Sequence, residues 1–206
     1  MPTITKRDGY GQVEPNQLSA QKTGQIYASL PLDKNVAVLQ NGEFMYYDYA
    51  SNKVTAEPKH AVGEPMLVFN EIKLYEPFWQ TSYKDFAMIR VGDNYVTSRR
   101  ATAAYGDGAE NTGATIDPGH TEYGYRMDGI APRLFKTNVG DIFTTNMIKL
   151  GEDYVAGETL LAPQLDSESK TLVLAPTSET TGMLWAVAKV YTMPDGQDAV
   201  KIQRIQ

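Results

Sequence analysis

The chain lacks several residues on which whole classes of function depend. None of its 206 residues is cysteine, which excludes a disulfide scaffold, thiolate chemistry and a Cys-ligated zinc or iron–sulfur site. The two histidines, His60 and His120, are 60 residues apart, so a zinc site would need both of them and distant carboxylates. The acids Asp107, Glu110 and Asp117 lack the spacing of an EF-hand loop. We therefore predict no metal and no cofactor.

Positive charge and long apolar runs are also scarce. The chain has 19 Lys or Arg against 25 Asp or Glu, a net charge of −6, whereas a protein that binds the nucleic-acid backbone needs a cationic face. No stretch approaches the roughly 20 apolar residues that span a bilayer. Residues 1–8 lack the apolar core of a secretory signal. We expect a soluble protein, made in a cytoplasm, with neither nucleic acid nor membrane as a partner.

The usual catalytic motifs are missing. The sequence has no Gly-x-Ser-x-Gly elbow, no Walker-type loop and no Gly-x-Gly-x-x-Gly before a helix. His120 stands among Asp117, Glu122 and Tyr123, where it could act as a general base if its loop closed over a substrate. An exposed loop histidine explains the same pattern more simply. We predict no catalytic residue and no enzyme, and a hydrolase built on His120 is the least favoured alternative.

What the chain does have is the composition of a β protein. It contains 13 Tyr, and its 17 Gly and 11 Pro are spread along the length, so that turn signals recur about every 8 to 12 residues. This pattern predicts an all-β fold, a sandwich or barrel of antiparallel sheets. Two hairpins are expected, 36–39 with 44–47 around Asn41-Gly42, and 184–191 with 199–205 around 194–196. Further strands are expected within 66–74, 86–91, 95–97, 141–150, 159–161 and 171–174, and short helices within 16–21 and 82–87.

Two irregular regions suggest how the chain is divided. Residues 1–24 have few apolar anchors and predict an extended N-terminal arm, and 104–132 predict a long Gly-rich loop or linker. Residues 88–97 and 147–156, offset by 59, match at five of ten positions, which is typical of a duplicated hairpin or of a recurring turn. We therefore expect β units at 25–103 and 133–206, with a single β domain as the close alternative.

Aromatic residues are the main candidates for contacts. Alternation along a strand puts Tyr47 and Tyr49 on one face and Tyr46 on the other. Packing against the strand at 36–39 is the simpler interpretation, and a sugar-stacking face is the alternative. Trp79 follows a strand and could be a core plug or an interface anchor.

Five segments spread over about residues 13–206 have a recognisable wording: QLSAQKTGQI (17–26), NGEFMYYD (41–48), LVFNEIKLYE (67–76), VGDIFTTN (139–146) and YTMPDGQDAVK (191–201). Together they resemble small structural proteins of tailed bacteriophages, namely decoration (cement), minor head or head-fibre proteins.

The resemblance implies a structural protein located on the capsid surface of a virion and assembled in the host cytoplasm. Its partner would be the major capsid protein lattice, which it binds and stabilises after assembly, and self-association is left open. The expected partner contacts are Leu18, Ile26, Trp79, Tyr123, Tyr125 and Arg126. The alternative is a glycan- or receptor-binding β module of a head fibre, in which Trp79, Tyr123 and Tyr125 stack on sugar rings.

Overall fold

The computed structural model describes residues 11–36, 38–60, 63–70, 88–90, 131–150, 155, 157–192 and 198–206, with only the backbone described at 38 and 88–90. Within these residues the chain is nearly all β, with one short helix, α1 (Ser19–Thr23), so the predicted fold class is confirmed. The strands are β1 (Val13–Gln17), β2 (Ile26–Tyr27), β3 (Val38–Gln40), β4 (Phe44–Asp48), β5 (Lys53–Thr55), β6 (Met66–Val68), β7 (Met88–Arg90), β8 (Leu134–Phe135), β9 (Ile142–Thr145), β10 (Leu160–Leu165), β11 (Leu172–Thr177), β12 (Trp185–Thr192) and β13 (Asp198–Arg204).

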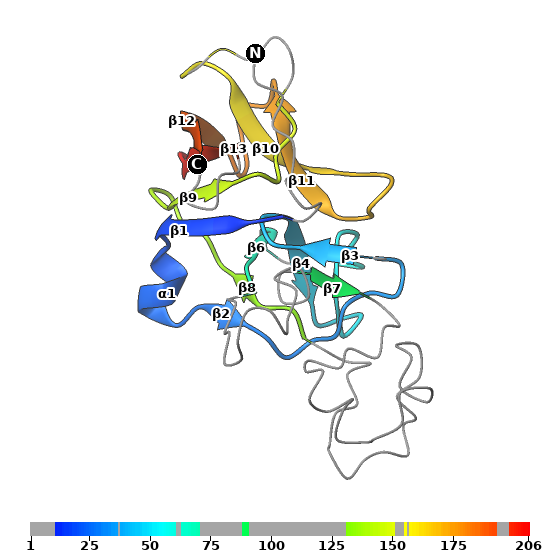
Figure 1. Ribbon diagram of the computed structural model, residues 1–206. Helices are drawn as coiled ribbons and strands as arrows, with labels where there is room; N and C mark the ends of the chain where they lie inside the picture. Colours follow the sequence, from blue (N-terminus) through cyan, green and yellow to red (C-terminus); the bar gives the residue numbers. More distant parts are fainter. Residues whose placement is uncertain are drawn as a thin grey trace, which may run out of the picture.

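Most of the strands form one curled antiparallel sheet, a half-barrel (Figure 1). Its order is β1-β9-β13-β12-β10-β11-β4-β6-β8-β2, with β5 paired to β4 beside this path, while β3 and β7 form a separate pair. β10 pairs with β12 only through Leu160 and Leu161. Pro163 lies beyond that point, where β10 has no described neighbour on the side away from β11, and such edge positions are where proline is tolerated in a sheet.

The core lies against the inner side of this sheet and is centred on three large aromatic side chains. Trp185 from β12, Phe44 from β4 and Phe143 from β9 are each 0 % exposed. The Trp185 ring lies 5.1 Å from that of Phe143 and 5.8 Å from that of Phe44, both in edge-to-face contact. Such contacts are favoured by the ring quadrupoles and add to the burial of a large apolar area. Strands far apart in the sequence are thereby held together.

Strands from the two expected β units are neighbours in the same sheet. β11 is bonded to β4, and β6 is bonded to β8, so neighbours come from 25–103 and from 133–206. The buried apolar residues of both ranges belong to one core cluster. The Gly-rich segment between them lies outside the described residues, apart from 131 and 132. The division into two units stays a prediction. Within the described residues, strands from 25–103 and from 133–206 share one sheet and one core.

The structure corrects the expected arm over residues 11–24. β1 pairs with β9, and Leu18 and Ala20 are 2 % and 0 % exposed within the core. The carboxylate of Asp141 accepts the backbone N–H of Ser19 at 2.9 Å and so supplies a cap to α1 from 122 residues away. Intramolecular contacts therefore order this segment without a partner. Residues 1–10 lie outside the described part of the chain.

The hairpin expected between 36–39 and 44–47 is wrong, whereas the C-terminal hairpin is confirmed in β12 and β13. β3 pairs instead with β7, and Asn41, the residue after β3, is hydrogen-bonded to Asn70. Its buried side-chain amide donates to the carbonyl of Asn70 at 3.1 Å and accepts the Asn70 N–H at 2.7 Å. Gly42 has φ +94°, and a Cβ there would stand 2.3 Å from Oγ1 of Thr145. The turn is therefore fixed by contacts across the sheet.

Candidate functional site

The most exposed large apolar side chain of the described residues ends a row of three tyrosines, here called the tyrosine ladder (Tyr27, Tyr47 and Tyr49). The ring of Tyr47 on β4 lies 5.3 Å from that of Tyr27 on β2 and 5.1 Å from that of Tyr49. Tyr27 is half-buried, Tyr47 in the middle of the row is 7 % exposed, and Tyr49 is 69 % exposed. The ladder therefore connects the core to the surface through aromatic contacts.

The inner part of the ladder is held by hydrogen bonds. The hydroxyl of Tyr47 accepts the backbone N–H of Ser29 at 3.1 Å and shares a second, short hydrogen bond with the Ser29 hydroxyl. On β4 the side chain of Tyr47 is opposite Val54 of β5, a fully buried residue. A ring that is packed below and hydrogen-bonded at its tip has few alternative rotamers. It offers Tyr49 a fixed edge to lie against.

The turn that carries Tyr49 is held by Asp48, the last residue of β4. Its carboxylate accepts the backbone N–H of Ala50 at 2.9 Å and that of Lys59 at 3.1 Å. Hydrogen bonding from Ser51, followed by these N–H groups, lowers the pKa of Asp48 below its ordinary value. An Asp that bonds backbone two residues on is a common turn device. Tyr49 is therefore presented from a turn that is held by hydrogen bonds.

Tyr49 keeps its proton at neutral pH. Desolvation, and secondly its neighbour Tyr47, raise its pKa above the ordinary value for tyrosine. An exposed phenol of this kind combines a flat apolar face with a hydroxyl that can donate a hydrogen bond. These are the properties of an anchor residue in a recognition surface.

The contacts expected from the sequence are distributed as follows. Leu18 is enclosed by the chain's own core at 2 % exposure, so its side chain presents almost no surface to a partner. Ile26 is half-buried in β2, where it pairs with Phe135 of β8 beside the tyrosine ladder. The other four expected contacts, Trp79, Tyr123, Tyr125 and Arg126, lie outside the described residues. His120 also lies outside them.

The sequence identified two members of the ladder and missed the third. The shared face of Tyr47 and Tyr49 is confirmed by their ring contact. Their expected packing against 36–39 is wrong, since β4 is bonded to β5, β6 and β11. Tyr27 was missed because its strand has two residues and the sequence around it carries no alternation. Only the pairing of β2 with β8 brings it to Tyr47.

Other kinds of site were sought over the described residues. In that part of the chain, no group of three or more His, Asp or Glu side chains is placed to hold a metal ion. No helix among the same residues is long and apolar enough to cross a membrane. Comparison with protein-family models, with curated proteins and with solved structures finds no match to this chain.

Proposed function

We propose that this chain is a non-enzymatic structural protein of a bacteriophage particle, which binds the assembled capsid and stabilises it. The sequence resemblance to decoration and minor head proteins suggests the partner, the major capsid protein lattice. The observation that carries the proposal is the tyrosine ladder, with Tyr49 at 69 % exposure on an ordered turn. Tyrosine is enriched among the residues that dominate binding energy at protein interfaces.

The ladder suits a repeated, shallow contact. Because Tyr47 and Tyr27 already fix the surroundings of Tyr49, docking orders few additional groups and loses little entropy. A protein that binds the assembled lattice better than free subunits shifts the equilibrium toward the lattice. Many copies on one shell then add up to a large stabilisation even where each contact is modest.

The test is co-sedimentation with capsids that lack their own copy of the protein. We expect saturable binding at a fixed ratio to the major capsid subunit. Tyr49→Ala should weaken binding at least about tenfold, since loss of an anchor costs more than about 1.4 kcal/mol. Val139→Ala is the matched control, because Val139 is also a turn residue and is 66 % exposed. Both variants should unfold at the temperature of the original protein.

Each outcome decides a separate point. Failure of the unaltered protein to bind shells overturns the proposed function. Shell binding that is insensitive to Tyr49→Ala refutes the role of the ladder alone. A glycan array run at the same protein concentration tests the alternative, a receptor-binding module of a head fibre. A clear glycan signal without shell binding would establish that alternative, because an exposed tyrosine ring also stacks on sugars.

A further inference from the structure

A second group of polar side chains lies on the sheet face opposite the core. The register places Glu14 of β1 beside Thr144 of β9, Thr144 beside Lys201 of β13, and Lys201 beside Lys189 of β12. These four residues form one row across four adjacent strands. The next row, which includes the buried Val13 and Val200, faces the core. Side chains of the first row therefore point away from the core.

A β-bulge puts Lys189 in this row. In a regular strand Trp185, Val187 and Lys189 would share one face. Pairing shifts register between Val187 and Lys189, and the burial pattern changes with it. Trp185 and Val187 are 0 % and 5 % exposed in the core, whereas Lys189 is exposed. The extra residue, Ala188, thus turns Lys189 and the following Tyr191 outward, and bulges commonly re-aim side chains at functional sites.

Tyr191 is fixed in place by groups from two other strands. Its hydroxyl donates to Oε2 of Glu14 at 2.6 Å and shares a 2.9 Å hydrogen bond with Oγ1 of Thr144. Burial first, then the hydrogen bond to Glu14, raises the pKa of Tyr191, so the hydroxyl stays protonated. Its ring lies 5.6 Å from Nζ of Lys189 and 5.4 Å from Nζ of Lys201. Two ammonium groups therefore converge on one immobilised ring.

This arrangement is unfavourable for the fold by itself. Like charges directly opposite each other on neighbouring strands repel, and the ring compensates only in part. Neither Lys189 nor Lys201 forms an ion pair with any residue that the structure describes. The chain carries 25 acids, yet among the described residues none of their carboxylates pairs with either lysine. Glu14, the carboxylate of the same row, is engaged by Tyr191.

We propose that Lys189, Lys201 and Tyr191 form a binding platform for an acidic peptide segment of a partner protein. A carboxylate of the segment lies between the two ammonium groups, and a neighbouring apolar side chain packs on the tyrosine ring. Lys189 is exposed and Lys201 and Tyr191 are half-buried, which leaves surface for an extended segment to contact, although Thr144 of the same row is fully buried beneath Tyr191. Nucleic acid fits less well, because two cations neutralise few phosphates. This platform is separate from the tyrosine ladder and does not depend on the proposed function.

The experiment is an NMR titration of the full chain with short blocked peptides. The probe is Gly-Glu-Phe-Glu-Gly, and the control peptide carries Gln in place of Glu. We expect saturable shifts of the Lys189, Lys201 and Tyr191 signals with a Kd of about 1 mM for the acidic peptide, weakened by salt, and no saturation with the control peptide. The double variant Lys189→Gln/Lys201→Gln should lower the affinity at least about tenfold.

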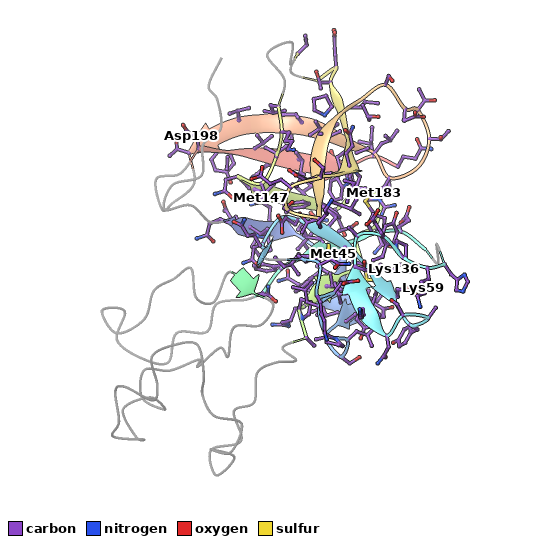
Figure 2. The ribbon with its side chains drawn as sticks, turned by 90° about the vertical axis from the view of Figure 1, so that its right-hand side faces the viewer. Met45, Lys59, Lys136, Met147, Met183 and Asp198 are labelled. Carbon is purple, nitrogen blue, oxygen red and sulfur yellow. The ribbon has the colours of Figure 1, made fainter. Side chains whose placement is uncertain are left out.

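A matched variant and a stability measurement complete the test. Lys59→Gln is the control, because Lys59 is exposed and lies on the other side of the molecule from Asp198, the first residue of β13 (Figure 2). The double variant should be as stable as the original protein or more so, since it removes a like-charge pair. Loss of stability would show that the lysines serve the fold and would overturn the proposal. Three binding results would also overturn the proposal. They are equal binding of both peptides, no binding of the acidic peptide, and binding of N-acetylneuraminic acid in place of the acidic peptide.

Discussion

Asp141 links the start of the described chain to the sheet, and its replacement by alanine is the most direct test of that link. The side chain is 4 % exposed. Its two oxygens accept the backbone N–H of Ser19, the hydroxyl of Ser19 and the backbone N–H of Asn138, each at 2.9 Å. The first two bonds cap α1, and the third closes the turn before β9. Asp141→Ala removes all three together.

The expected loss follows from these three bonds. Removing a capping side chain costs about 0.5–2 kcal/mol of folding free energy. The Asn138 N–H loses its acceptor, and because that residue is exposed, water restores part of the bond, which leaves a cost of about 1 kcal/mol. We therefore expect Asp141→Ala to lower the free energy of unfolding by about 1.5–3 kcal/mol.

Urea unfolding at pH 7 measures this change, with hydrogen exchange at the Ser19 amide as a local readout. Asn138→Ala is the matched control. It removes only the 2.6 Å bond from Nδ2 to the Ser19 hydroxyl and keeps the backbone N–H, so it should cost less than about 1 kcal/mol. If Asp141→Ala costs less than about 0.5 kcal/mol, or no more than the control, the tertiary cap does not hold α1 and the reasoning is refuted.

Two further predictions concern the turns. Gly42→Ala and Gly24→Ala both place a side chain at positive φ, +94° and +69°, but only the Cβ at Gly42 meets other atoms. Gly42→Ala should therefore lower the free energy of unfolding in urea by at least about 2 kcal/mol more than Gly24→Ala, and equal losses would contradict the crowding at Gly42. The pKa of Asp166 is lowered, chiefly by hydrogen bonding from Lys149, so the carboxylate stabilises the fold above its unfolded pKa and loses this effect as the pH falls through its folded pKa. Asp166→Asn should therefore cost up to about 1 kcal/mol at pH 6 and almost nothing at pH 2, and an equal cost at both pH values would be inconsistent with ionic pairing.

The sequence predicted those parts of the fold that depend on local pattern. The pair β12 and β13 was found because two long apolar alternations flank a Pro-Asp-Gly turn. β1 was missed, since Val-Glu-Pro-Asn-Gln has one apolar residue and a proline, and its pairing partner β9 lies more than 120 residues away. The hairpin expected between 36–39 and 44–47 is wrong, because the pattern of neighbouring residues does not predict the hydrogen bonds between Asn41 and Asn70. Long-range polar contacts therefore determine the parts of the fold that the periodicity of the sequence does not predict.

The candidate surfaces show the same limit. Alternation correctly put Tyr47 and Tyr49 on one face, because this depends only on the period of a strand. Alternation alone would have placed Lys189 and Tyr191 with Trp185 in the core, and the bulge at Ala188 reverses that placement. A lysine and a tyrosine at the inward positions of an otherwise apolar strand are the signal that could have revealed the bulge.

Cryo-electron microscopy of capsids saturated with the purified protein is the direct test of the proposed capsid binding. We expect density for the curled half-barrel at regular positions on the outer surface of the shell, with the turn between β4 and β5, and thus Tyr49, against the capsid subunits. Shells without added density, or with that turn facing solvent while another surface forms the contact, would contradict it.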